Sequence, residues 1–380
     1  MTILNYILWS ASPEIFSIGT FSLRWYGLFF AAGFLITQQI LYYMYKKEGK
    51  PERDVDTLTI YMVVATILGA RLGHVLFYQP DIIWKDPLGI FLPFEFSPFK
   101  FTGLQGLASH GAAIGILFAL WLYSRKKKPG QSYLQVVDRI VILVALTGAL
   151  IRFGNYFNAE IIGKPTDNPW GVVFAGKLNE SIHGKSVDVD GIVETIGFVK
   201  NDTTSGRRTT QVGHKPMLIY VFFKPGTTEG QIETLVNGNL HYVVSRNLAE
   251  YFYEPTLHFF YQITKEEGGT YAARIKTVGI ARHPAQMYES ISCVFLCILL
   301  FLIWNKYREN LPPGRLLGIF LIVCFGLRFA YEFLKENQES FESTLPINMG
   351  QILSIPLVLA GIVILYLSYR KNNQDQTSGN

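Results

Sequence analysis

Three arginines of this sequence, Arg71, Arg152 and Arg328, lie within long apolar segments. A guanidinium group forms forked pairs of hydrogen bonds that match the oxygens of a phosphate, so arginine is well suited to bind an anionic headgroup. Glu289 and Glu332 lie in similar segments, and Glu332 follows Arg328 by four residues, a spacing at which helical side chains meet. Ionisable side chains are costly inside a bilayer and are therefore functional candidates. These residue types predict a positively charged site for an anionic group.

The segments that carry these side chains are long enough to cross a membrane. The chain has 380 residues, of which 49% are hydrophobic and 17% charged, and it contains seven apolar runs of the ~20 residues that span a bilayer. Soluble chains have about 25% charged residues, and a net charge of +5 gives no reason to expect nucleic acid as a partner. We predict an all-α polytopic membrane protein with seven transmembrane helices, near residues 22–44, 57–78, 103–123, 134–157, 285–305, 314–334 and 348–369.

Basic residues predict the orientation of the chain, because short cytoplasmic loops are enriched in Lys and Arg. The loops after the first, third and fifth runs are basic, whereas residues 1–21 contain no Lys or Arg and the loop after the sixth run has Lys335 alone. This pattern predicts an extracytoplasmic N-terminus and a cytoplasmic C-terminus. Residues 1–21 also lack the basic start of a cleavable signal peptide, so we expect the first run to remain in the mature protein.

With this orientation, the polar side chains of all seven runs fall in the outer third of the bilayer. Runs that begin outside carry them early, and runs that end outside carry them late. The exceptions near cytoplasmic ends include Asp138 and Arg139, which we attribute to topology or helix pairing. His74 lies at the outer third but is interpreted as a core histidine. The sequence therefore predicts one polar cavity open toward the outer leaflet. The candidates to line it are Tyr26, Arg71, His110, Arg152, Asn155, Tyr288, Glu289, Arg328, Glu332, Asn348 and Gln351.

The connection between the fourth and fifth runs, about residues 164–284, is too long for an ordinary loop. Stretches 186–199 and 217–223 have the composition of strands, whereas the periodicity of 228–248 fits either a helix or a strand. We predict an extracytoplasmic head with a mostly β or α+β fold, inserted between helices four and five. The predicted domains are 1–163 with four helices, 164–282 for the head, 283–370 with three helices, and 371–380 as a cytoplasmic tail.

Several remaining residues are expected to serve the structure alone. Arg24 stands beside Trp25 and Tyr26 at the boundary of a run and is interpreted as an interfacial anchor. The three cysteines lie inside apolar runs, where we expect them to pack rather than to react. The sequence contains no metal-ligand spacing and no Gly-rich phosphate loop.

Residues 152–163 read RFGNYFNAEIIG, which closely resembles the signature of the bacterial prolipoprotein diacylglyceryl transferase family, Arg-x-Gly-Asn-Phe-x-Asn-x-Glu-x-x-Gly. Tyr156 stands where phenylalanine is usual. The resemblance implies seven transmembrane helices with the N-terminus outside, but it says little about residues 175–280, a segment longer than in a typical member. Further blocks resemble the family in the same order: RWYGL (24–28), GARLGHVLFY (69–78), SHGAAIG (109–115), NPWGVVF (168–174), RHPAQMYE (282–289), LRFAYEFLKE (327–336) and NMGQILSIP (348–356).

The resemblance implies an activity and its partners. Members of the family transfer the sn-1,2-diacylglyceryl group of phosphatidylglycerol to the thiol of a lipobox cysteine in a preprolipoprotein, forming a thioether and releasing glycerol phosphate. The expected partners are phosphatidylglycerol, the lipobox segment and the lipid bilayer of the bacterial cytoplasmic (inner) membrane. Neither a metal nor an organic cofactor is expected, and no nucleic acid.

Together with side-chain chemistry, the resemblance also implies roles for individual residues. We expect the arginines to clamp the phosphate, Glu160 and Glu332 to orient arginines, and His110 to be the candidate base for the thiol, although clustered arginines alone also favour a thiolate. The expected catalytic residues are His110, Arg152, Asn155, Glu160, Arg328 and Glu332. The expected residues for phosphatidylglycerol binding are Tyr26, Arg71, Arg152, Asn155, Gly163 and Arg328, and the supporting residues are His283, Gln286, Tyr288 and Glu289.

The main alternative is a secondary transporter for an anionic or lipid substrate, because transporters also place charges inside the bilayer. Transporters usually hold their site near the midplane and often have repeated halves. Here the polar side chains avoid the cytoplasmic half, and no repeat relates the two halves of the sequence. An intramembrane peptidase would need a Ser/His pair, an HExxH motif or paired aspartates, which the apolar runs lack.

Overall fold

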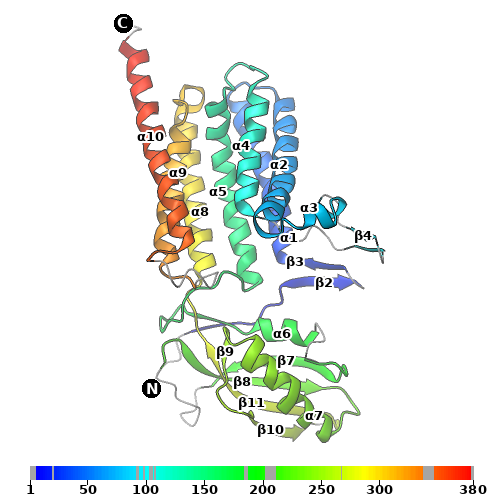
Figure 1. The fold of residues 1–380 in the computed structure, drawn as a ribbon. Coiled ribbons are helices and arrows are strands. Elements are labelled where there is room, and N and C mark those ends of the chain that lie inside the picture. Colours follow the sequence, from blue (N-terminus) through cyan, green and yellow to red (C-terminus); the bar gives the residue numbers. More distant parts are fainter. Residues whose placement is uncertain are drawn as a thin grey trace. The chain divides into compact units, whose positions relative to one another are not determined.

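The computed structural model describes most of the chain, as helices and short strands (Figure 1). The described residues are 6–18, 21–90, 94–96, 99–101, 106, 108–183, 187–201, 211–266, 268–336 and 346–377. Parts of the predicted elements lie outside them, including residues 103–105 and 107 of the third apolar run, Ser186 of a predicted strand, and residues 378–380 of the predicted tail.

Each predicted apolar run overlaps a helix, although residues 106 and 108 of the third run precede α4 and are not helical. Helix α2 begins before its run because Glu52 and Asp54 follow Pro51, and acidic residues are favourable in a first turn. The helices are α1 (Trp25–Lys47), α2 (Glu52–Tyr78), α4 (Ser109–Ser124), α5 (Tyr133–Phe157), α8 (Ala285–Tyr307), α9 (Arg315–Glu332) and α10 (Met349–Thr377).

Five of these helices are long and apolar enough to cross a membrane, within the part of the chain that the structure describes: α1, α2, α5, α8 and α10. Helix α4 is apolar but shorter, and α9 has 18 residues that include Arg315, Arg328 and Glu332. Five apolar helices of this length are typical of a membrane protein. The count of seven membrane spans rests on α4 and α9 as well, and stays a prediction.

The long connection between α5 and α8 contains an antiparallel sheet, as the predicted strands indicated, although residues 187–192 of the stretch 186–199 form no strand. Its strands run in the order β10, β11, β8 and β7, and β9 also pairs with β11. They are β7 (Val193–Lys200), β8 (His214–Phe223), β9 (Phe252–Tyr253), β10 (Phe260–Lys265) and β11 (Tyr271–Ile280).

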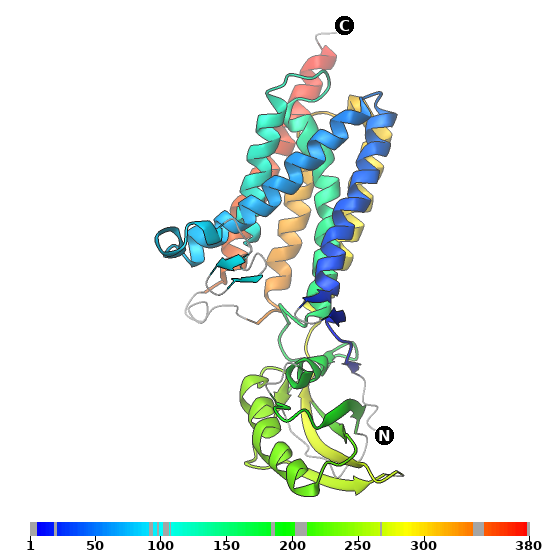
Figure 2. The same cartoon turned by 90° about the vertical axis from the view of Figure 1, so that its right-hand side faces the viewer.

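The ambiguous stretch 228–248 is helical. It forms α7 (Glu229–Leu235) and the π-helical turns η2 (Val236–Leu240) and η3 (Val243–Asn247). Thr228 and Gln231 cap the start of α7 reciprocally, which stabilises a helix end. The helix packs on one face of the sheet (Figures 1 and 2), where alternate β8 residues meet it in one apolar core. With α6 (Gly176–His183), the segment has an α+β composition.

Short elements complete the described structure. Strand β1 (Ile7–Trp9) pairs in parallel with β6 (Val172–Phe174), which joins the start of the chain to the head core. Two hairpins pair β2 (Glu14–Ile18) with β3 (Phe21–Arg24), and β4 (Phe94–Phe96) with β5 (Phe99–Phe101). The remaining turns are α3 (Ile82–Lys85), η1 (Leu88–Ile90) and η4 (Arg308–Asn310).

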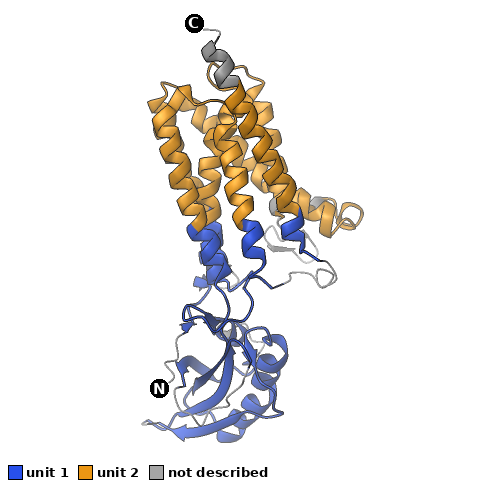
Figure 3. Ribbon diagram, turned by 90° about the vertical axis from the view of Figure 1, so that its left-hand side faces the viewer, with its two compact units in different colours: residues 1–30, 150–291, 328–352 blue, residues 31–149, 292–327, 353–380 orange. Residues whose placement is uncertain are grey.

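The chain divides into two compact units (Figure 3). Unit 1 comprises residues 1–30, 150–291 and 328–352, and unit 2 comprises 31–149, 292–327 and 353–380. Helices α1, α5, α8, α9 and α10 contribute residues to both. These two units differ from the predicted domains, which separate the membrane helices from the extracytoplasmic head. The predicted domains stay a prediction.

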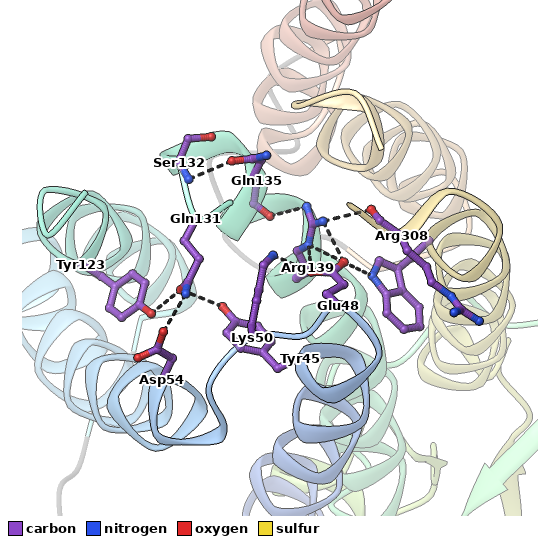
Figure 4. Close-up of polar contacts among 11 residues, drawn as sticks. Tyr45, Glu48, Lys50, Asp54, Tyr123, Gln131, Ser132, Gln135, Arg139 and Arg308 are labelled. Atoms are coloured by element: carbon purple, nitrogen blue, oxygen red, sulfur yellow. Dashed lines mark hydrogen bonds and ion pairs between the residues drawn. The ribbon is translucent and has the colours of Figure 1, made fainter. Parts of the chain in front are cut away.

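Unit 2 contains a buried polar network that joins helix ends (Figure 4). Arg139 of α5 forms an ion pair of 2.8 Å with Glu48, which follows α1, and the same carboxylate accepts a hydrogen bond of 2.6 Å from Trp304 of α8. The neighbouring Asp138 accepts the backbone N–H of Gly314 at 2.7 Å, just before α9. A buried charge is tolerated when it is paired in this way. The interpretation of Asp138 and Arg139 as helix-pairing residues is confirmed.

Candidate functional site

The end of α5 carries the first part of the candidate site, all of it in unit 1. Arg152 Nη1 lies 3.5 Å from Asn155 Oδ1, and Asn155 Nδ2 donates to Glu160 Oε2 at 3.3 Å. Asn158 Nδ2 donates to the other carboxylate oxygen of Glu160, also at 3.3 Å. The predicted residues Arg152, Asn155 and Glu160 are therefore brought together, and two amides fix the orientation of the exposed Glu160 carboxylate.

Gly163 closes the loop that follows α5, and a larger residue would not fit there. A Cβ atom at this position would lie 2.5 Å from the His283 carbonyl oxygen and 2.8 Å from that of Leu334. The Gly163 N–H donates to the same His283 carbonyl at 3.0 Å. Gly163 thus acts through close backbone packing, which places the loop against the chain before α8 and after α9.

A row of alternating charges forms the centre of the site. Arg152 Nε pairs with Glu289 Oε2 at 2.5 Å, Lys335 Nζ pairs with Glu289, and Lys335 Nζ also pairs with Glu332 Oε1 at 3.0 Å. Arg328 Nε completes the row at 3.6 Å from Glu332 Oε1. Three cations and two carboxylates leave a net charge of +1, which favours an anionic ligand.

Burial divides the row into a hidden centre and accessible ends. The side chains of Lys335 and Glu332 are 2% and 6% exposed, whereas those of Arg152 and Arg328 are 24% and 37% exposed. Each arginine contacts its carboxylate through Nε. The carboxylates therefore hold the two guanidinium groups in place, and the arginines are the members that a ligand reaches.

Lys335 is a member of the row that the sequence did not predict, because it stands in the loop after the sixth run. The usable signal was its spacing: Arg328, Glu332 and Lys335 are separated by four and three residues, so they share a face of a helix or of its continuation. In the structure α9 ends at Glu332, and Lys335 follows in a turn that pairs with Gly163.

The start of α10 supports Glu332 from the other side. Asn348 Nδ2 donates to Glu332 Oε2 at 3.1 Å. The Asn348 N–H donates to Gln351 Oε1 at 3.1 Å, and the Gln351 N–H donates to Asn348 Oδ1 at 2.9 Å, so the two residues cap the helix start reciprocally. A Cβ at Gly350 would lie 2.5 Å from Glu332 Cδ, so this carboxylate packs directly on the helix start. Asn348 and Gln351, predicted as polar lining residues, thus position Glu332.

Of the four predicted supporting residues, Glu289 belongs to the charge row, and the other three lie beside the loop. His283 Nδ1 lies 3.1 Å from Tyr288 Oη, and Trp170 Nε1 donates to the same oxygen at 2.9 Å. Gln286 Nε2 donates to the Glu160 backbone carbonyl. Burial lowers the pKa of His283, which favours its neutral imidazole.

Tyr26 belongs to the same unit and lies at the start of α1. A Cβ at Gly154 would lie 3.0 Å from Tyr26 Cα and 3.1 Å from Cδ2 of its ring. Gly154, which directly precedes Asn155, allows this approach because it has no side chain. The structure therefore brings Tyr26 against the turn of α5 that carries Arg152 and Asn155.

Arg71 and His110 belong to unit 2, so their association with the charge row stays a prediction. Arg71 is buried and donates to the backbone carbonyls of Ile90 at 3.0 Å and Gly89 at 2.8 Å. His110 is exposed at the start of α4, and its ring lies 4.9 Å from that of Phe77.

The apolar helices and the arginine–carboxylate row define a helical membrane protein with a candidate site for an anionic group. Residues 13–367 match the family model described as prolipoprotein diacylglyceryl transferase, and the chain belongs to this family. It is 30% identical to the phosphatidylglycerol–prolipoprotein diacylglyceryl transferase of Bacteroides fragilis over 370 residues, 97% of each chain. It is also 30% identical to the enzymes of that name from Tolumonas auensis, over 96% of this chain and 98% of the relative, and from Chloroherpeton thalassium, over 98% of each.

These alignments also bear on the long segment between α5 and α8. Because they cover 96 to 98% of this chain and 97 to 98% of each relative, the relatives have nearly the same length. A segment of this size is therefore not an addition peculiar to this chain.

Proposed function

We infer that this chain is a phosphatidylglycerol–prolipoprotein diacylglyceryl transferase, which carries out the first step of lipoprotein maturation. Family membership over residues 13–367 carries this inference. The charge row supports it, because its two accessible arginines suit the oxygens of a phosphodiester headgroup. The acceptor is the thiol of the lipobox cysteine in a preprolipoprotein.

The proposed topology has seven membrane-spanning helices, with the N-terminus outside the bacterial inner membrane and the C-terminus in the cytoplasm. Helix α4 has 16 residues and a length of about 24 Å, close to the ~30 Å of a hydrocarbon core. The charged residues of α9 lie at its ends, Arg315 at the first position and Arg328 and Glu332 in the last turns, where they reach the membrane interface. The segment between α5 and α8 is then an extracytoplasmic head.

In the proposed reaction the thiolate sulfur attacks the glycerol carbon that bears the phosphate ester. A carbon–sulfur bond forms as the carbon–oxygen bond breaks, and glycerol phosphate leaves with the electron pair. Arg152 and Arg328 bind the phosphate and stabilise the charge that develops on the leaving oxygen. Glu289 and Glu332 orient the arginines, as their contacts through Nε allow. Asn155 and Tyr26 are proposed to hydrogen-bond the headgroup, and Arg71 is proposed as a further phosphate ligand.

The activity is tested by incubating the purified protein with phosphatidylglycerol and a lipobox peptide. We expect a thioether-linked diacylglyceryl peptide and an equal amount of glycerol phosphate, and no product from a peptide whose cysteine is replaced by serine. Formation of product in detergent, without a sealed membrane, would also dismiss the transporter alternative. Absence of both products under conditions where the protein is folded would contradict the inference.

His110 is the proposed base for the lipobox thiol, since an imidazole titrates near neutral pH. A base that takes the thiol proton makes the rate less dependent on the thiol's own ionisation. In His110→Gln we expect a rate about tenfold lower at neutral pH, because only the minor ionised fraction of a thiol with a pKa of ~8.5 then reacts, and a rate that rises more steeply with pH than in the wild type. An unchanged profile would assign thiol activation to the arginines alone.

A further inference from the structure

The signature loop, residues 158–163, holds two residues in a strained backbone conformation. Ala159 has a φ of 51° and Ile161 a φ of 56°, in the left-handed region that residues with a side chain rarely adopt. The strain is most severe for Ile161, because its β-branched side chain crowds the backbone. Such conformations persist only where surrounding contacts hold them. The loop that carries Glu160 therefore depends on contacts from outside it.

Three side chains outside the loop hold its carbonyl groups. The Tyr251 hydroxyl donates to the Ala159 carbonyl at 2.9 Å, and Arg282 Nη1 donates to the Gly163 carbonyl at 3.1 Å. Between them, Gln286 donates to the Glu160 carbonyl. Gln286 belongs to α8, whereas Tyr251 and Arg282 come from the sheet-bearing head. The head thus forms hydrogen bonds to both ends of the signature loop.

Tyr251 is itself fixed within the head. Its backbone carbonyl accepts the Ile280 N–H at 2.8 Å at the end of β11, and its own N–H donates to Leu248 at 2.9 Å. Arg282 Nε donates at 2.7 Å to the carbonyl of Glu250, the residue before Tyr251. The two side chains that bind the loop are therefore also linked to each other. The Tyr251 ring is buried, and burial raises the pKa of its hydroxyl, which remains a hydrogen-bond donor at neutral pH.

We propose that the head positions the signature loop for the transfer reaction, with Tyr251 as the positioning residue and Arg282 as a second tether. The proposal rests on the proposed placement of Asn155 and Glu160 at the substrate. Tyr251 touches neither reactant; it fixes the peptide group next to Glu160, whose carboxylate is held by Asn155 and Asn158. Loss of this tether lets the loop relax from its strained conformation and moves Glu160 away from the geometry needed in the transition state.

The test compares two variants that each remove one hydroxyl from the head. Tyr251→Phe loses the bond to the loop, whereas Tyr261→Phe loses a bond of similar length, 2.9 Å from Asn237 Nδ2, inside the head and far along the chain from the loop. Both are assayed for kcat and KM with phosphatidylglycerol and a lipobox peptide. Backbone amide hydrogen exchange is measured for residues 159–163 of the same preparations.

For Tyr251→Phe we expect kcat to fall about fivefold to tenfold with little change in KM, and faster exchange confined to the loop. Tyr261→Phe should match the wild type in both. Wild-type kcat and wild-type exchange in Tyr251→Phe would overturn the proposal. Equal losses in both variants would also overturn it, because they would indicate a general loss of head stability. A wild-type protein that transfers nothing would refute the proposed function, while the exchange comparison would still report on the tether.

Discussion

Arg152→Lys is expected to lower kcat/KM for diacylglyceryl transfer by about a hundredfold to a thousandfold, the cost of removing one donor that stabilises developing charge. Arg152 already uses Nε to pair with Glu289 at 2.5 Å, and its remaining donors form the fork that suits a phosphate. Lysine has one nitrogen, which Glu289 would attract. The variant therefore retains the charge of the row but loses the ligand for the leaving group. Initial rates of thioether formation at several phosphatidylglycerol concentrations measure the effect.

Arg24→Lys is the matched control for this prediction. Arg24 is the last residue of β3, immediately before α1 in unit 1, but its side chain is 43% exposed and pairs with Glu14 at 3.2 Å and Glu180 at 3.1 Å. Exposed pairs of this kind contribute little. We expect Arg24→Lys to transfer at nearly the wild-type rate. Near-normal activity in Arg152→Lys would remove Arg152 from the phosphate clamp.

The helices were predictable from sequence because an uninterrupted apolar run of about 20 residues is typical of a membrane span and rare in chains that fold in water. The strands of the head followed from local composition, but the helix at 229–235 was left undecided although Thr228 and Gln231 have the spacing of a capping box. A capping signal therefore resolves an ambiguity that periodicity cannot, since short apolar stretches fit both structures.

The candidate site was predictable most directly where one motif or one helix carried it. Arg152, Asn155 and Glu160 stand close together in the chain, and the structure joins them. Arg328 and Glu332 share a helix, and they pair at 3.6 Å. The hydrogen bond from Tyr251 to Ala159 links residues 92 positions apart, and no local sequence pattern predicts such a contact. Lys335 was missed for a different reason: a lysine after a predicted span is ordinarily a solvated loop residue.

Lys335→Met is expected to destabilise the protein by about 3–5 kcal/mol, the cost of breaking a buried ion pair by removing one partner. Lys335 is the shared cation of Glu289 and Glu332, and its side chain is only 2% exposed. Without it, each carboxylate is left with a single arginine, and the net charge of the row falls from +1 to zero. We therefore expect a lower unfolding temperature in detergent and a higher KM for phosphatidylglycerol, because the arginines must serve the carboxylates instead of the ligand.

Two further variants separate charge from packing in this prediction. Lys335→Arg retains the cation and should keep most of the stability and a KM near the wild-type value. Lys164→Met removes an exposed lysine whose Nζ donates to the Phe333 carbonyl at 3.1 Å, and it should leave both quantities unchanged. If Lys335→Met unfolds at the wild-type temperature and binds phosphatidylglycerol normally, the carboxylates do not need a shared cation. That outcome would mean that the two arginines neutralise Glu289 and Glu332 and also bind the headgroup. A one-to-one pairing of charges would then not describe the row.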